Sequence, residues 1–364
     1  MRIAVNCRSI LLNNRTGIGR YTYHLLDALG KVDGHNAYSL YAPLRLFDRK
    51  RRLPDFPYKN FRRQVDRFHK GVGPADIYHV PCPDDIGHYE GKLVVTVHDL
   101  IYKTYPQAHT QQTIDLTERY MGQMVRRADK IICISDHTRE DVHRFFDVPR
   151  QKTCAILNGV DHAIFYPIED LAPAQAFLKT IGVNGGFVLF VGTIEPRKNL
   201  AGLLQAMGQL KTAGKKLPHL VVAGMRGWMM EKITPVIEQS GLKDRVIFTG
   251  FVTDAQLNML YNTCAMFVFP SFYEGFGFPI VEAFCAGALV VASKTSSCLQ
   301  ISGDAALLVD PARPDDIAGA IMRLMEDAAL AQQLRQKALA RAKSFSFEKT
   351  ARETVNVYEQ LCPN

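Results

Sequence analysis

Short apolar runs alternate along the chain with longer segments in which apolar residues recur every three or four positions. The short runs have the length and composition of buried strands, and the longer segments are typical of amphipathic helices. Strands are predicted at residues 2–6, 38–42, 93–97, 130–134, 154–157, 187–191, 219–223, 245–249, 266–269 and 289–293. This alternation predicts an α/β fold with parallel, doubly wound sheets, which bind ligands beyond the carboxyl ends of their strands.

The length of 364 residues, 47% of them hydrophobic, predicts two domains. We place the first domain at residues 1–165 and the second at 187–343, with a linker and the first helix of the second domain at 166–186. Residues 344–364 repeat apolar side chains at spacings of three and four, which predicts an amphipathic helix at the end of the chain.

The positive charge is concentrated in the first half of the chain. The net charge is +8, and residues 1–165 contain 25 Lys and Arg against 18 Asp and Glu. Arg45–Lys70 is especially basic, with aromatic residues between the charges. A solvated face, a nucleic-acid surface and a patch against an anionic membrane all fit this composition. No nucleic-acid fold signature accompanies the stretch, and the aromatic residues favour a membrane interface over plain solvent.

The location of the protein and the state of its cysteines are also indicated by the sequence. No run approaches the roughly 18 apolar residues of a membrane span, and the start, MRIAVNCRSI, lacks the apolar segment of a secretory signal. We therefore expect a cytoplasmic protein. The eight cysteines are scattered, without a CxxC pair, so we expect buried thiols rather than disulfides or metal ligands.

The stretch Pro270–Gly287, PSFYEGFGFPIVEAFCAG, is the most informative in the chain. It is predicted as a strand end, a glycine turn at Gly275 and Gly277, and a helix whose free N–H groups suit a phosphate. Glu274 lies in the turn, and Glu282 is expected on the flank of the helix. Two solvent-facing glutamates are the simpler explanation of this spacing alone.

Other polar groups follow predicted strands. Arg197 and Lys198 come after the strand at 187–191, beside a helix start, and could neutralise a diphosphate, although surface cations are equally common there. His98 follows the strand at 93–97, where a structural histidine is the more frequent finding. Gly17 lies in GIGRYT, which lacks the third glycine and the tight turn of a dinucleotide motif but still makes a phosphate-facing helix start.

The EGFGFP turn, the phrase PRKN and the turn NGVD together resemble the retaining family-4 glycosyltransferases of the GT-B fold. More generally, the chain resembles bacterial surface-polysaccharide mannosyltransferases. The resemblance covers nearly the whole chain and is loose at residues 30–90, where acceptor specificity would be built. It implies two Rossmann-like, doubly wound parallel-sheet domains that face each other across a cleft, with the final helix crossing back to the first domain.

The resemblance also implies roles for single residues. Glu274 would hold hydroxyls of the donor sugar, Arg197 and Lys198 the diphosphate, His98 the sugar from the opposite domain, and Glu282 the ribose. The remaining donor-binding residues that it implies are Gly17, Thr193, Val252, Gly275, Phe276 and Gly277.

Two departures from the family pattern bear on the site. Thr193 stands where some members have an arginine, so charge compensation depends more on Arg197 and Lys198. Gln300 replaces a customary glutamate, whose usual contact is therefore in doubt. Asp84-Asp85 lacks the spacing of a metal-binding DxD, and the two cations take over the metal's charge. We expect no metal and no other cofactor.

The function implied is retaining transfer of a hexose, with mannose favoured, from a nucleotide diphosphate sugar, with GDP-mannose favoured, to a hydroxyl of a glycan. The acceptor is expected to be lipid-linked, in lipopolysaccharide O-antigen synthesis at the inner face of the membrane. The alternatives are a UDP-sugar-dependent glucosyl or GlcNAc-type transferase, a nucleotide-sugar epimerase on the same fold, and a catalytically silent sugar-nucleotide-binding partner. The expected partners are the donor, the glycan and an anionic membrane surface, and no nucleic acid.

Overall fold

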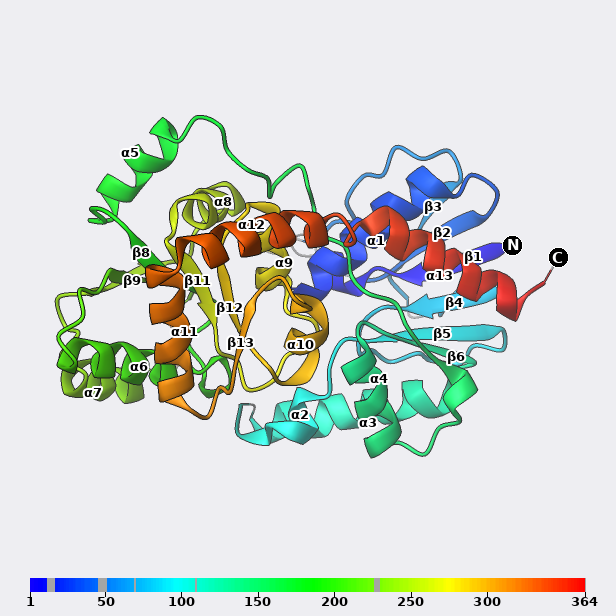
Figure 1. The fold of residues 1–364 in the computed structure, drawn as a ribbon. Coiled ribbons are helices and arrows are strands. Elements are labelled where there is room, and N and C mark those ends of the chain that lie inside the picture. Colours follow the sequence, from blue (N-terminus) through cyan, green and yellow to red (C-terminus); the bar gives the residue numbers. More distant parts are fainter. Residues whose placement is uncertain (12–16, 45–50, 69, 109, 226–229, 364) are drawn as a thin grey trace. The chain divides into compact units, whose positions relative to one another are not determined.

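The computed structural model of the protein describes residues 1–11, 17–44, 51–68, 70–108, 110–225 and 230–363. The chain forms two compact units (Figure 1). The first comprises Met1–Gly159 together with Ser346–Asn364, and the second comprises Val160–Phe345. Each unit is built on a parallel sheet of its own.

The sheet of the first unit has seven parallel strands in the order β3-β2-β1-β4-β5-β6-β7. Its strands are β1 (Arg2–Asn6), β2 (Ala37–Pro43), β3 (Phe61–Asp66), β4 (Ile77–Val80), β5 (Lys92–Val97), β6 (Lys130–Cys133) and β7 (Thr153–Ala155). The chain builds from β1 outward to β3, then returns to the other side of β1 with β4. Such a reversal of strand order opens a crevice at the carboxyl ends of the two strands where it occurs.

The helices of the first unit include the last helix of the chain. They are η1 (Arg8–Ile10), α1 (Gly17–Val32), α2 (Ile101–Thr104), η2 (Pro106–Ala108), α3 (Gln111–Arg127), α4 (Asp136–Phe145), η3 (Arg150–Lys152) and α13 (Phe347–Leu361). α13 packs against α1, where the rings of His24 and Phe347 stack with centroids 4.9 Å apart. A Cβ on Gly159, in the NGVD turn, would lie 2.1 Å from the Phe347 backbone nitrogen, so this turn requires glycine.

A histidine occupies the interior of β4, which is a central strand. His79 is fully buried between the Tyr358 hydroxyl, 2.6 Å from Nδ1, and the Thr96 hydroxyl, 2.8 Å from Nε2. Both ring nitrogens therefore have partners, which is the condition for burying an imidazole. This contact joins α13 to the centre of the first sheet.

The sheet of the second unit has six parallel strands in the order β10-β9-β8-β11-β12-β13. They are β8 (Phe187–Val191), β9 (His219–Ala223), β10 (Val246–Gly250), β11 (Met266–Phe269), β12 (Val290–Ser293) and β13 (Leu307–Val309). The helices of this unit are α5 (Ala172–Thr180), η4 (Pro196–Lys198), α6 (Leu200–Thr212), α7 (Met230–Gln239), α8 (Asp254–Thr263), α9 (Phe278–Cys285), α10 (Ser296–Ser302), α11 (Pro314–Glu326) and α12 (Ala328–Ala342). Here the strand order reverses between β8 and β11.

All ten predicted strands are present, and β1, β8, β9 and β11 have the predicted bounds. The prediction missed β3, β4 and β13. β3 is an edge strand with an exposed, arginine-rich sequence, β4 has a histidine inside it, and β13 has only three residues. β3 and β4 therefore lack the apolar run by which the others were recognised, and the apolar β13 is too short to stand out.

The bounds of the units differ from the predicted ones. Residues 160–186, which include the predicted linker, belong to the second unit. Their backbone is fixed to α8, because the Tyr166 N–H donates to the Asn258 side-chain oxygen at 3.3 Å and the Ile168 N–H donates to that of Asn262 at 2.7 Å. The segment is therefore a fixed part of the second unit.

The thiols and helices bear on two expectations from composition. All eight cysteines are free thiols, and six of them are buried. No helix in the described part of the chain combines the length and the apolar character that a bilayer span requires.

Candidate active site

The candidate site in the second unit lies where the strand order reverses. β8 and β11 are neighbours, but the chain continues from them toward opposite edges of the sheet. The segments that follow their carboxyl ends are therefore free to separate and leave room between them for a ligand. These two segments carry Arg197 and Lys198 on one side and Glu274 on the other.

The segment after β8 is shaped by close backbone contacts. Gly192 has φ +141°, and a Cβ on Gly224, after β9, would lie 2.2 Å from the Gly192 carbonyl oxygen, so the two loops can pass only because Gly224 lacks a side chain. Arg197 and Lys198 form the short helix η4. Asn199 follows with φ +58°, and its side chain caps α6 by accepting the Gly202 N–H at 3.1 Å.

The segment after β11 turns sharply before α9. Gly277, with φ +99°, is the N-cap of α9, which confirms the expected glycine at the helix start. Two serines of α10 hold the turn: Ser297 Oγ donates to the carbonyls of Glu274 and Phe276 at 2.8 and 2.9 Å, and Ser296 Oγ accepts the Glu274 N–H at 3.0 Å. This supporting role of α10 was not predicted. The signal for it was the serine pair at the start of that helix.

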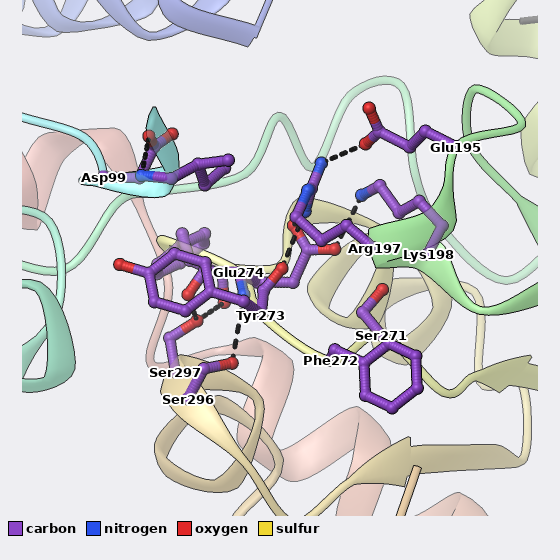
Figure 2. A network of polar contacts seen from close by, with 12 residues as sticks. Asp99, Glu195, Arg197, Lys198, Ser271, Phe272, Tyr273, Glu274, Ser296 and Ser297 are labelled. Carbon is purple, nitrogen blue, oxygen red and sulfur yellow. Dashed lines mark hydrogen bonds and ion pairs between the residues drawn. The ribbon is translucent and has the colours of Figure 1, made fainter. Parts of the chain in front are cut away.

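The two segments are joined by a network of ion pairs. Figure 2 shows the Glu274 carboxylate between the two cations, with one oxygen 2.9 Å from Arg197 Nη1 and the other 2.7 Å from Lys198 Nζ. Arg197 also pairs with Glu195 and donates from Nη1 to the Tyr273 carbonyl at 2.7 Å. The structure thus brings together three residues that the sequence analysis had assigned to one site.

Burial and charge act in opposite directions on Glu274. Glu274 and Arg197 are buried residues, only 7% and 8% exposed. Burial alone would raise the pKa of the Glu274 carboxyl, but the charges of Arg197 and Lys198 outweigh it and hold that pKa below its usual value. Glu274 is therefore an anion at neutral pH.

Glu282 differs from the expectation in one respect. It was expected on the flank of α9, but it is buried with 4% of its surface exposed. The Tyr261 hydroxyl donates to its carboxylate at 3.3 Å, which gives the buried charge a partner within the fold. All six residues of α9 from Ile280 to Cys285 are buried, so its polar residue is covered as well.

The other predicted donor-binding residues of this unit differ in exposure. Thr193 is exposed and Val252 is half-buried, whereas Gly275, Phe276 and Gly277 are buried. Gln300 lies in α10 and accepts a hydrogen bond from Arg341 through its backbone carbonyl at 2.5 Å.

The two remaining predicted site residues, Gly17 and His98, lie in the first unit. Gly17 is the exposed first residue of α1. His98 follows β5 and is buried, with its ring 4.8 Å from that of Tyr21 in an edge-on arrangement. Its Nε2 lies 2.8 Å from the Pro81 carbonyl oxygen, and because a carbonyl can only accept, Nε2 carries the proton.

The protonation state of His98 follows from this setting. Burial lowers the pKa of His98 to about 4, although the hydrogen bond to Pro81 acts in the opposite direction. At neutral pH the ring is therefore uncharged, with its lone pair on Nδ1. It can accept a hydrogen bond from a hydroxyl, but it is not a source of positive charge.

Asp84 and Asp85 do not form part of a metal-binding cluster in the described residues. No group of three or more His, Cys, Asp or Glu side chains gathers there in metal-binding geometry. Asp84 is buried and forms an ion pair with Arg8, and it also accepts a hydrogen bond from Asn6 Nδ2 at 3.0 Å.

Comparison with known proteins defines the class of the chain. Residues 15–164 match the model of Glycosyltransferase Family 4, and residues 176–341 match that of Glycosyl transferases group 1. The chain is 33% identical over 287 residues to O-antigen chain mannosyltransferase B of Escherichia coli, a match that covers 78% of this chain and 74% of the relative. The chain belongs to the family-4 (group 1) glycosyltransferases.

Other relatives and solved structures agree. The serotype-specific mannosyltransferase WbdA of Escherichia coli is 30% identical over 79% of this chain, which spans only 36% of that longer protein. Sucrose-phosphate synthase of Thermosynechococcus elongatus has a TM-score of 0.78 at 22% identity, covering 99% of this chain and 98% of that chain. HepE of Anabaena, solved with UDP and glucose, has a TM-score of 0.71 at 17% identity, over 98% and 99% of the two chains. The GT-B fold predicted from the sequence is confirmed.

Proposed function

We propose that the protein transfers mannose from GDP-mannose to a hydroxyl of a glycan, with retention of configuration at the anomeric carbon. The observation that carries this proposal is the network of Arg197, Lys198 and Glu274 at the reversal between β8 and β11. The names of the relatives, which are mannosyltransferases, support the choice of sugar.

The reaction breaks the bond between the anomeric carbon and the diphosphate. Negative charge grows on the leaving phosphate, and a preorganised pair of cations stabilises it, a contribution commonly worth about 3–4 kcal/mol per donor in enzymes of other classes. Arg197 and Lys198 have this role in the proposal. Both are already paired with carboxylates in the structure, Arg197 with Glu195 and Glu274, and Lys198 with Glu274. We propose that the diphosphate replaces Glu274 at the cations and that the freed carboxylate binds hydroxyls of the donor sugar.

Retention is proposed to occur by front-face transfer, in which the leaving phosphate takes the proton of the acceptor hydroxyl. A double displacement would need a carboxylate nucleophile at the anomeric carbon. Glu274, ion-paired with two cations, is a weak nucleophile. His98, neutral and with its lone pair on Nδ1, is suited to accept a hydrogen bond from a sugar hydroxyl. Glu282 is proposed to bind the ribose. We propose that no metal is needed, so a chelator should leave the rate unchanged.

A UDP-sugar donor is the second candidate. The solved structure of HepE, which shares the fold, contains UDP. The cation pair binds the diphosphate in the same way whichever base is attached. A thermal-shift panel of GDP- and UDP-sugars with the purified protein distinguishes the two donors.

The acceptor is proposed to be lipid-linked, with the protein bound at the inner face of the membrane. Around β3, Arg62 and Arg63 are exposed and the ring of Phe68 is 69% exposed, a combination suited to anionic headgroups. Part of the basic stretch, residues 45–50 and 69, lies outside the described residues. Co-sedimentation with anionic vesicles at low salt tests this point, and absence of binding would remove the membrane from the proposal.

The transfer itself is tested with two variants and their controls. Lys198→Ala and Glu274→Ala should each reduce mannosyl transfer by about 100-fold or more, because each removes a charged group of the donor site. The matched controls are Lys215→Ala and Glu326→Ala, which break an exposed ion pair of the same unit and should leave the rate nearly unchanged. The proposal would be contradicted if the wild-type protein transferred no sugar from any nucleotide donor and the two variants showed the same lack of transfer.

A further inference from the structure

Two residues other than glycine have a positive φ in the part of the chain that the structure describes, and both flank the candidate donor site. Asn199, at +58°, follows Lys198, and Ser296, at +52°, contacts the segment that carries Glu274. Asparagine tolerates this left-handed backbone better than other side chains do, whereas serine is rarely found in it. Because strained backbone persists where the surrounding structure or a function maintains it, the contacts of Ser296 are of interest.

Three consecutive side chains, Thr295 to Ser297, bond to the segment around Glu274. Ser296 Oγ accepts the Glu274 N–H at 3.0 Å, and Ser297 Oγ donates to the Glu274 carbonyl at 2.8 Å (Figure 2). Thr295 Oγ1 donates to the Phe272 carbonyl at 3.1 Å. Both polar groups of the Glu274 backbone are therefore held by the start of α10.

The positive φ of Ser296 accounts for this arrangement. Consecutive side chains alternate between the two faces of a strand and lie about 100° apart around a helix, so neither pattern directs three in a row at one segment. Ser296 lies where β12 has ended and α10 begins, and its left-handed backbone departs from both patterns. Glycine would adopt this backbone more easily, but it would leave the Glu274 N–H without its acceptor.

These backbone bonds of Glu274 become more important when the donor binds. In the structure, the Glu274 carboxylate is fixed by its ion pairs with Arg197 and Lys198. The diphosphate is proposed to replace it there, and the carboxylate must then hold the donor sugar without those two partners. The bonds to Ser296 and Ser297 involve only backbone groups of Glu274, so the exchange leaves them in place. They fix the point from which the carboxylate reaches the sugar.

We propose that Ser296 is a positioning residue for transfer: its hydroxyl, held by a strained backbone, fixes Glu274 for its contact with the donor sugar. This inference rests on the proposed function, in which Glu274 binds sugar hydroxyls. It implies that serine at this position lowers stability relative to glycine but raises the rate of transfer. Stability and transfer should therefore respond differently to substitution of Ser296.

Two substitutions separate the hydroxyl from the backbone. Ser296→Gly and Ser296→Ala both remove the acceptor of the Glu274 N–H, but only glycine relieves the positive φ. The denaturation midpoint of Ser296→Gly should therefore lie about 2–4 °C above that of Ser296→Ala. Both variants should lower kcat for mannosyl transfer about tenfold, because a small displacement of a positioned group reduces the rate strongly. Their Kd for GDP should not change, because the two cations lie on the other segment.

Nucleotide binding provides a measurement that does not depend on transfer. The wild type should bind GDP-mannose more tightly than GDP, because Glu274 adds contacts to the sugar, and both variants should lose most of this difference. If the protein prefers uridine nucleotides, UDP-glucose and UDP are compared instead. Ser302→Ala is the matched control. Ser302 lies in the same helix and is buried, and its hydroxyl has no hydrogen-bond partner among the described residues, so this change should alter neither kcat nor the difference.

The outcomes separate this inference from the proposed function. Unchanged kcat and unchanged sugar-dependent binding in both variants of Ser296 would overturn the inference while leaving the transferase proposal intact. Losses in Ser296→Ala alone would also overturn it, because activity would then follow stability and not the hydroxyl. So would a wild type that binds the nucleotide sugar no more tightly than the nucleotide. Loss of the binding difference in both variants of a protein that transfers no sugar would support the positioning role and count against the transferase proposal alone.

Discussion

The two sheets reverse their strand order at equivalent places, and the polar groups found there differ in kind. At the reversal in the second unit, Arg197 is buried and Lys198 is half-buried, and both contact Glu274. At the reversal in the first unit, the half-exposed Arg8 pairs with the buried Asp84 beside an open cavity whose lining also contains Arg51 and three tyrosines. One architecture thus provides a dense charged site and a balanced, partly aromatic one. The two adjacent cations of the former suit the diphosphate that we propose to bind there.

The largest expected effect comes from neutralising the carboxylate of the charged site. Glu274→Gln should lower mannosyl transfer by about 100- to 1,000-fold, because an anchor of the donor sugar is lost. The same change should tighten GDP binding about fivefold or more, because the diphosphate no longer competes with a carboxylate for two cations. Calorimetric titration and a transfer assay measure the two effects. Weaker GDP binding in this variant would contradict the proposed exchange of partners at the cations.

Lowering the pH should reduce the stability of the first unit before that of the second. Burial lowers the pKa of His79 to about 3 and that of His98 to about 4, from 6.5 in the unfolded chain. Below pH 6.5 the unfolded state therefore binds more protons than the folded state. The stability that these neutral rings contribute is complete above pH 6.5 and is lost as the pH falls toward 4. Each ring should lower the free energy of unfolding by about 1.4 kcal/mol for every unit by which the pH falls in this window.

Hydrogen exchange resolves this difference between the units. Between pH 6.5 and 5, amides of β4 and β5 should lose protection once the intrinsic pH dependence of exchange is removed, whereas those of β8 and β11 should not. The lowered pKa of Glu274 keeps the ion pairs of the second unit charged throughout this range. Equal loss of protection in both sheets would contradict the assignment of the effect to His79 and His98.

The smallest effect is expected at the carboxylate of the first reversal. Asp84→Asn should lower the free energy of unfolding by only about 1 kcal/mol, because its half-exposed partner Arg8 can return to solvent. Its affinity for GDP should equal that of the wild type. Chemical denaturation and calorimetry measure these quantities. A change in GDP affinity would show that the two reversals are not independent sites.

Much of the fold could be predicted because the central strands of each sheet are continuous apolar runs, as in β8 (FVLFV) and β9 (HLVVA). β4 could not, because its burial of His79 depends on Tyr358, 279 positions away in α13. Edge strands such as β3 have one solvated side and a composition like that of a loop.

The same limit on prediction from the sequence applies to the two polar sites. Lys198–Glu274 and Arg8–Asp84 each join residues 76 positions apart, but only Lys198 and Glu274 had been assigned to a common site from the sequence. Lys198 and Glu274 lie in sequence phrases that resemble a family pattern, whereas Arg8, in η1 after β1, and Asp84, after β4, lie outside any such phrase. The pairing of β1 with β4 brings those two segments together, and that adjacency was absent from the predicted strands.

The central claim is that Arg197 and Lys198 bind the diphosphate of the donor. Calorimetric comparison of GDP with GMP, and of UDP with UMP, tests it most directly. The account predicts that the diphosphate of the preferred base binds at least about tenfold more tightly than its monophosphate, a difference of about 1.4 kcal/mol, and that Lys198→Ala largely removes this difference. Equal affinity for both nucleotides in the wild type, or a difference that persists in Lys198→Ala, would contradict it.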